Sequence, residues 1–250
     1  MGNFVHLHIH SEFSLLDGAN RIKDIPVRAK ELGMDSIAIT DHGVMFGVID
    51  FYKACKANGI KPIIGCEVYV APRLRTDKDP NFDSKYNHLI LLAKNNNGYK
   101  NLSKLVSLSF TEGFYYKPRI DKEILEKYHE DLICCSACLA GEVNQALLKN
   151  DIEEAKKIAL WYKSIFGKDY YLEIQNNGVK EQVMVNQKLI QLSKELDIPL
   201  VATNDAHYTK REDAYNHEVL LCIQTGKKMT DEDRMRFETD ELYKISRRNE

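Results

Sequence analysis

The stretch SIAITDHGVMFGVIDFYKACKANGIKPIIGCEVYV, residues 36–70, contains the unit from which the fold can be predicted. Apolar runs rich in β-branched residues at 36–40 and 62–70 have the composition of buried strands. Between them, residues 46–58 are amphipathic and stop at Gly59, a residue typical of helix ends. The order strand, helix, strand predicts parallel strands joined by a crossover helix.

The same alternation recurs along the chain. The predicted strands are Phe4–His8, Ser36–Thr40, Pro62–Val70, His88–Ala93, Leu132–Cys135, Tyr170–Gln175 and Pro199–Thr203. The predicted helices are Asp24–Leu32, Phe46–Asn58, Gly98–Phe110, Asp121–Tyr128, Glu142–Lys149, Asp151–Phe166 and Val179–Leu196. Seven strand–helix units in 250 residues fit a closed barrel better than an open sheet. We therefore expect an α/β fold, a seven-stranded TIM-like (β/α)7 barrel.

Composition narrows the class of protein. Hydrophobic residues make up 44% and charged residues 29%, which is ordinary for a globular chain. No apolar run approaches the roughly 18 residues that span a bilayer, and the start lacks a signal peptide, so we expect a cytoplasmic protein without a membrane partner. The six cysteines are then free thiols or ligands. A net charge of -2 argues against a domain-wide clamp on nucleic acid, but not against a local basic patch.

Three histidines, His6, His8 and His10, alternate with apolar residues near the start of the chain. In an extended strand they share one face, because alternate side chains point to the same side. Neutral imidazole is a common ligand for zinc, manganese and iron, so the spacing favours a metal site. An exposed polar strand face is the alternative.

Metal-capable side chains recur where the predicted strands end, which is where barrels carry their functional residues. They are His8, His10, Asp17, Asp41, His42, Glu67, Cys138, Asp205 and His207. Each alone has an ordinary explanation, such as a helix cap or a solvated loop residue. Their joint recurrence at one barrel end is much harder to obtain by chance, so it predicts a shared site.

Several other polar residues fit this pattern less well. His88 opens its predicted strand, so either the boundary is displaced or the side chain reaches the site from an unusual angle. His129 and His217 lie in polar helical contexts and are expected at the surface. Cys135 and Cys138 form a Cys-x-x-Cys pair, but a redox role is the weaker interpretation because no small thioredoxin-like unit surrounds it. The charged, weakly patterned residues 227–250 are expected to be a connection or a tail.

The motifs His8-x-His10, Asp17, Thr40-Asp41-His42, Glu67, His88, Cys138 and Asp205-x-His207 resemble those of the PHP (polymerase and histidinol phosphatase) family. Residues 4–8, 13–18, 59–65, 113–120, 217–226 and 236–240 are similar to the N-terminal domain of bacterial DNA polymerase III α subunits. The resemblance implies a distorted barrel at 1–226, and a connection at 227–250 toward polymerase domains beyond Glu250.

The resemblance also implies a trinuclear metal site. Its ligands would be His8, His10, Asp17, His42, Glu67, His88, Cys138, Asp205 and His207. Asp41 would stand behind them and orient an imidazole, and His6 takes a position where many members have Asp. The mixed nitrogen, oxygen and sulfur ligands favour zinc, with manganese or iron as alternatives.

Four negative ligands and three divalent ions leave about +2, a charge suited to a phosphate oxyanion. Metal-activated water then performs hydrolysis without a side-chain nucleophile. The resemblance implies a 3′–5′ proofreading exonuclease whose partners are a DNA 3′ end, the remaining α subunit and other replisome subunits. Alternatives are a catalytically silent, metal-stabilised module and a stand-alone histidinol-phosphatase-like enzyme. Lys117 and Arg119 could contact a DNA backbone, although scattered charges are more often solvated.

Overall fold

The structure is a computed structural model that describes residues 4–237 and 239–243. The strands are β1 (Ser36–Ile39), β2 (Lys61–Val70), β3 (Asn87–Ala93), β4 (Arg119–Ile120), β5 (Leu132–Cys135), β6 (Tyr170–Gln175) and β7 (Leu200–Thr203). The helices are α1 (Asp24–Glu31), α2 (Val48–Asn58), α3 (Asn96–Thr111), α4 (Lys122–Tyr128), α5 (Glu142–Leu148), α6 (Ile152–Phe166), α7 (Lys180–Leu196) and α8 (Ala214–Thr225). Six predicted strands and seven predicted helices are therefore present, whereas β4 and α8 were not predicted.

One sheet runs in the order β1-β2-β3-β5-β6-β7, and the short β4 pairs with β2. The pairs β1–β2, β5–β6 and β6–β7 are parallel, as predicted. The prediction of uniformly parallel strands is wrong for β3, which runs antiparallel to both β2 and β5. Residues 71–86, which join β2 to β3, contain no helix among their described positions. Without a crossover element, the chain returns beside β2 in the opposite direction.

The predicted first strand, Phe4–His8, is not a regular strand. Residues 6–10 instead make a few hydrogen bonds on each side. On one side the Ala38 amide donates to the His6 carbonyl at 2.9 Å. On the other, the His10 amide donates to the Ala206 carbonyl at 3.0 Å. Because β1 and the segment after β7 flank it, this irregular segment joins the two sheet edges, and the α/β barrel prediction is confirmed in distorted form.

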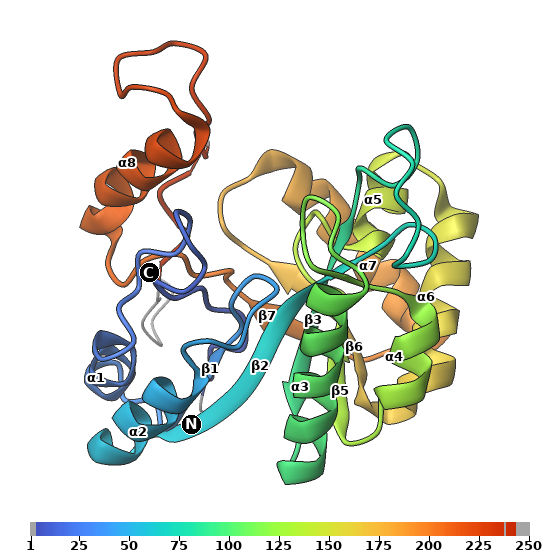
Figure 1. The fold of residues 1–250 in the computed structure, drawn as a ribbon, viewed down its shortest axis with the longest axis horizontal. Coiled ribbons are helices and arrows are strands. Elements are labelled where there is room, and N and C mark those ends of the chain that lie inside the picture. Colours follow the sequence, from blue (N-terminus) through green and yellow to red (C-terminus); the bar gives the residue numbers. More distant parts are fainter. Residues whose placement is uncertain (1–3, 238, 244–250) are drawn as a thin grey trace.

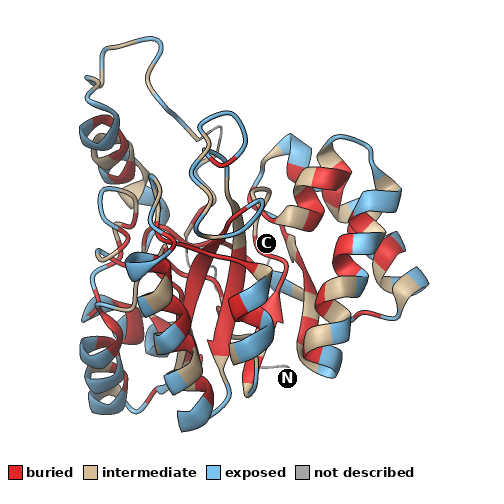
Figure 2. Ribbon diagram, turned by 45° about the vertical axis from the view of Figure 1, so that its right-hand side comes forward, coloured by how far each residue is buried: buried red, intermediate tan, exposed pale blue. Residues whose placement is uncertain are grey.

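Helices surround the strands (Figure 1): α1, α2 and α8 lie to one side, and α4, α5 and α6 lie to the other. They turn their buried faces inward and their exposed faces outward (Figure 2). The larger apolar core joins β2, β3, β5 and β6 to α3–α7, while a second core lies under α1 and α2. Among the described residues, no helix combines the length and apolar character needed to cross a bilayer.

Candidate metal centre

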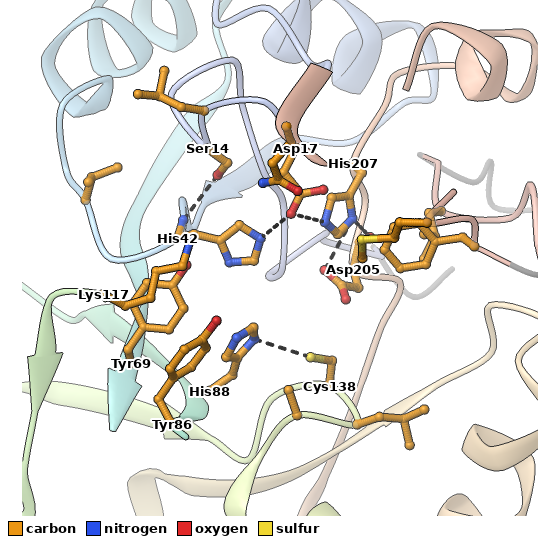
Figure 3. Close-up of a pocket in the computed structure, with 18 of the residues that line it drawn as sticks. Ser14, Asp17, His42, Tyr69, Tyr86, His88, Lys117, Cys138, Asp205 and His207 are labelled. Atoms are coloured by element: carbon orange, nitrogen blue, oxygen red, sulfur yellow. Dashed lines mark hydrogen bonds and ion pairs between the residues drawn. The ribbon is translucent and has the colours of Figure 1, made fainter. Parts of the chain in front are cut away.

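A cavity of about 680 Å³ opens at one end of the barrel (Figure 3). Six of the predicted site residues line it: Asp17, His42, His88, Cys138, Asp205 and His207. The other three, His8, His10 and Glu67, are fully buried. The structure thus brings all nine predicted residues to one end of the barrel.

The reversed direction of β3 explains the position of His88. Because β3 is antiparallel to β2, its first residues lie beside the last residues of β2, and His88 pairs with Tyr69. Its Nδ1 atom is 3.1 Å from Glu67 Oε1 and 3.6 Å from Cys138 Sγ. The predicted strand boundary was therefore correct to one residue, and the assumed direction was wrong.

Glu67 lies at the middle of the group. Its Oε1 atom is 3.2 Å from His8 Nε2 and 3.8 Å from Cys138 Sγ. Its Oε2 atom is 2.5 Å from His42 Nδ1, although this contact lacks the alignment of a hydrogen bond. Short, poorly aligned contacts between buried polar atoms are expected where ligands converge on a shared ion.

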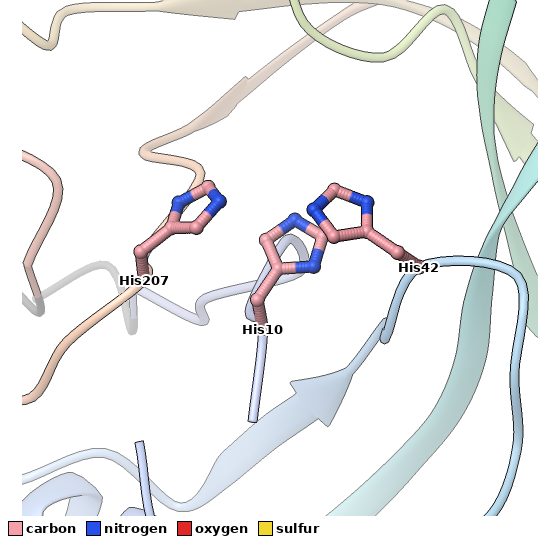
Figure 4. A group of neighbouring side chains, drawn as sticks. All are labelled: His10, His42 and His207. Carbon is pink, nitrogen blue, oxygen red and sulfur yellow. The ribbon is translucent and has the colours of Figure 1, made fainter. Parts of the chain in front are cut away.

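Asp17 brings together the imidazoles on the open side of the group. Its Oδ2 atom is 3.0 Å from His42 Nε2 and 3.6 Å from His207 Nε2. The rings of His10, His42 and His207 lie side by side (Figure 4), with ring centroids of His10 and His42 3.9 Å apart. The loop can place Asp17 here because it folds tightly: a Cβ on Gly18 would lie 2.0 Å from the Ser11 carbonyl oxygen.

Glu173, on β6, fixes the orientation of His8. Its Oε1 atom accepts a hydrogen bond of 2.7 Å from His8 Nδ1, and it also accepts from Gln175 and Thr203. With its proton on Nδ1 held by Glu173, His8 turns Nε2 toward the other ligands, and that atom is 3.1 Å from Asp205 Oδ1. Sequence reasoning missed Glu173; its only signal was a carboxylate within a mostly apolar strand.

Asp41 acts on the imidazoles through Ser14. The Ser14 hydroxyl donates to Asp41 Oδ1 at 2.7 Å, so it can accept from His10 Nδ1 at 3.3 Å and from the His42 amide at 3.1 Å. This leaves His10 Nε2 bare. His207 is oriented in a similar way, because its Nδ1 donates to a backbone carbonyl, that of Asp205, at 2.8 Å.

The electrostatics of the group follow from burial and mutual proximity. Burial, followed by the charges of His42 and His207, lowers the pKa of His10 to about 3. Burial would also lower the pKa of His42, but Glu67 and Asp17 together raise it to about 10. Burial opposes ionisation of Asp17, yet His207, His217 and His42 hold its pKa well below the usual range. Without bound cations, protons on imidazoles therefore balance the carboxylates.

The donor set fits divalent metal ions. Four overlapping trios place their ligand atoms within 4.8 Å of one another: His8, His10 and Glu67; His42, Glu67 and His88; His10, His42 and His207; Asp17, His207 and His217. In His8, His10 and His207 a carboxylate, hydroxyl or carbonyl oxygen contacts Nδ1, so Nε2 is the nitrogen that can face an ion, the arrangement that metal-binding imidazoles need. Mixed nitrogen, oxygen and sulfur donors suit transition metals.

Two sequence expectations are wrong. His217 was expected at the surface, but it is 2% exposed and lies beside Asp17, because α8 brings its first turn over the site. Arg119 was offered as a DNA contact, but it is fully buried and donates to the carbonyls of Gly113, Asp83, Arg75 and Asp77. The polar context of each residue in sequence could not reveal the neighbours that enclose it.

The cysteines and His6 lie mostly in the interior of the protein. All six cysteines are free thiols, as predicted. Cys135 is buried whereas Cys138 is partly exposed, and Cys138 lies next to His88. His6 is buried, with its ring 4.9 Å from that of Phe4.

Residues 6–177 match the family described as the PHP domain. The chain belongs to the PHP family. This confirms the resemblance that its motifs indicated. It is also 53% identical over 241 residues to a DNA polymerase III subunit alpha from Borreliella burgdorferi, covering 96% of this chain and 21% of that protein. The DNA polymerase III subunit alpha of Campylobacter jejuni is 50% identical over 253 residues, covering 97% of this chain and 21% of that protein.

This PHP domain therefore spans about a fifth of the length of the α subunits it matches. Among solved structures, an amidohydrolase from Chromobacterium violaceum aligns with a TM-score of 0.48 and 13% identity, covering 81% of this chain and 87% of that one. A two-domain protein from Bacteroides vulgatus, with a predicted PHP-like metal-dependent phosphoesterase, aligns with a TM-score of 0.46 and 14% identity. The alignment covers 90% of this chain and 55% of that one. Alignments at this level carry no argument about chemistry.

Proposed function

We propose that this PHP domain is a metal-dependent phosphodiester hydrolase of the 3′–5′ exonuclease type that acts on DNA. Its nine ligands would hold up to three divalent ions, zinc most readily, with manganese or iron as alternatives. The ligands are His8, His10, Asp17, His42, Glu67, His88, Cys138, Asp205 and His207. The observation that carries the proposal is the convergence of these side chains at one end of the barrel, where six of them line an open cavity.

Divalent ions bound here supply Lewis acidity and activate water for attack on a phosphoester. The chain's own residues orient the site. Glu173 and Ser14 hold the outer nitrogens of His8 and His10, so each imidazole turns its inner nitrogen toward the other ligands, where that nitrogen would bind an ion once free of a proton. Asp41 in turn accepts a hydrogen bond from Ser14, which supports a role for it behind the ligands. No side-chain nucleophile is needed in this arrangement.

The cavity suits a nucleotide chain. Lys117 is the one lysine or arginine among the described residues that line it, and its Nζ lies 5.5 Å from the ring centroid of Tyr69. An ammonium group there can contact a phosphate backbone. The rings of Phe13, Tyr69 and Tyr86 also line the cavity and offer apolar faces to bases.

In this proposal the natural context is replication. The high identity to α subunits favours a domain that works within a longer polymerase in the cytoplasm, with a DNA 3′ end, the other α-subunit domains and further replisome subunits as partners. Residues 1–226 would form the domain and residues 227–250 the connection to the polymerase. Residues 238 and 244–250 of that connection lie outside the described part of the chain. Within this view, a silent metal-stabilised module is the main alternative, and a stand-alone histidinol-phosphatase-like enzyme is favoured less by these relatives.

A hydrolysis assay on the purified chain separates the alternatives. Asp17→Asn removes a charge that faces three imidazoles, whereas the control Asp197→Asn alters a fully exposed helix end. We expect zinc-loaded wild type and Asp197→Asn to shorten 5′-labelled single-stranded DNA from its 3′ end, and Asp17→Asn to be about 100-fold slower. Bound metal with equal rates, or with no cleavage by any variant, would leave the silent-module alternative.

A further inference from the structure

A tenth polar residue, His217, enters the metal centre from α8. It lies on the first turn of that helix, and its ring is buried. Its Nε2 atom is 3.3 Å from Asp17 Oδ1, while His42 and His207 face the other carboxylate oxygen, Oδ2. The two oxygens of Asp17 therefore have different neighbours: His217 faces Oδ1, with its ring beside that of His207, while His42 and His207 face Oδ2.

Aromatic packing holds the ring of His217 in this orientation. The ring stacks on Phe237 with centroids 5.4 Å apart and an interplanar angle of 26°. Tyr208 lies at 5.4 Å and the ring of His207 at 5.3 Å. Side chains locked by packing can orient a ligand accurately, because little conformational freedom remains to be lost when the ligand binds.

We propose that His217 is a positioning residue that holds Asp17 Oδ1 so that Oδ2 faces an ion shared with His42 and His207. The role rests on the proposed metal function and adds to it a residue that the nine-ligand set lacks. A carboxylate ligand is commonly fixed by a hydrogen bond to its second oxygen, and losing such a partner typically lowers metal affinity 10- to 100-fold. His217 also brings the first turn of α8 into contact with the metal centre, and Gln224 of the same helix lines the cavity.

The test compares three variants by zinc titration against a chromophoric chelator. His217→Phe keeps an aromatic ring against Phe237 and Tyr208 but has no donor for Asp17. His217→Gln supplies an amide donor at a similar reach. His129→Gln is the matched control, because His129 lies at the end of α4, remote from the site, with its Nδ1 2.6 Å from the Glu126 carbonyl. Thermal melts of each metal-free protein check folding.

We expect His217→Phe to bind its last zinc ion 10- to 100-fold more weakly than wild type. His217→Gln should stay within about threefold and His129→Gln should be unchanged, because both keep the bond to Asp17. Wild-type affinity in His217→Phe would overturn the proposal. So would equal weakening in His217→Gln and His217→Phe, since a ligand or a packing residue is not rescued by an amide.

Failure of the proposed function gives different results. If wild type binds zinc but does not cleave DNA, the hydrolase proposal fails while the zinc comparison still decides the role of His217. If wild type binds no zinc at all, the metal site itself is overturned, and the role of His217 with it. A normal wild-type titration with unchanged His217→Phe overturns the positioning role alone.

Discussion

Removal of the Glu173 carboxylate should weaken metal binding, although Glu173 is not among the proposed ligands. Its Oε1 atom accepts a 2.7 Å hydrogen bond from His8 Nδ1, and both side chains are fully buried. This bond keeps a proton on Nδ1, so Nε2 is the nitrogen that would lose its proton to bind an ion. Without it, either ring nitrogen of His8 can carry the proton, and the ring can turn.

The size of the effect follows from the bond that is lost. A hydrogen bond to a charged group contributes about 1.5–3 kcal/mol, which corresponds to roughly 10- to 150-fold in a dissociation constant. Glu173→Gln keeps an acceptor oxygen but loses the charge, so we expect about a tenfold weaker zinc affinity. Glu173→Ala should approach 100-fold. It should also lower the free energy of unfolding by about 2 kcal/mol, because Gln175 and Thr203 lose their acceptor.

The assay is a zinc competition titration at fixed pH, paired with urea unfolding. Glu142→Gln is the matched control, because Glu142 binds Lys122 and the Tyr162 hydroxyl, away from the cavity. We expect that variant to lose stability without losing zinc affinity. Equal zinc affinity for wild type, Glu173→Gln and Glu173→Ala would refute the argument that Glu173 sets the state of His8.

Three further predictions concern the site and its surroundings. Zinc binding at pH 8 should release at least one proton, and zinc affinity should rise with pH, because the pKa of His42 is raised to about 10 and a ligand nitrogen must lose its proton. The test is calorimetry in two buffers of different ionisation enthalpy. Equal heats in the two buffers would contradict the prediction. Arg119→Ala should lower the free energy of unfolding by about 3 kcal/mol, because several buried carbonyls lose their hydrogen-bond donor. Urea denaturation measures this change, and a value below about 1 kcal/mol would be inconsistent with the role of Arg119. Lys117→Ala should raise KM for single-stranded DNA several-fold at unchanged zinc content, whereas an unchanged KM would remove Lys117 from the substrate path.

Much of the barrel could be predicted because strand and helix patterns are local. Six strands and seven helices lie within a few residues of their expected bounds. The direction of β3 could not be predicted, since a hydrophobic run has the same pattern in either direction. Residues 4–8 were expected to form a regular strand, but the hydrogen bonds of this segment depend on two distant segments, at Ala38 and Ala206.

In the site, too, some residues could be predicted from the sequence and others could not. His8, His10 and Asp205 could be found because strand ends in a barrel meet at one end. Glu173 and His217 could not, because each becomes part of the site only through a partner remote in sequence, His8 and Asp17 respectively. Arg119 shows the converse: an arginine expected in solvent is enclosed by a loop that folds around it.

Anomalous diffraction at the zinc edge, from crystals of this chain grown with zinc, tests the central claim most directly. We predict up to three anomalous peaks between Glu67, Asp17 and Asp205, each within about 2.0–2.3 Å of imidazole nitrogen, carboxylate oxygen or thiolate sulfur. Peaks found only at surface residues, or no peak within the cavity at saturating zinc, would contradict the account.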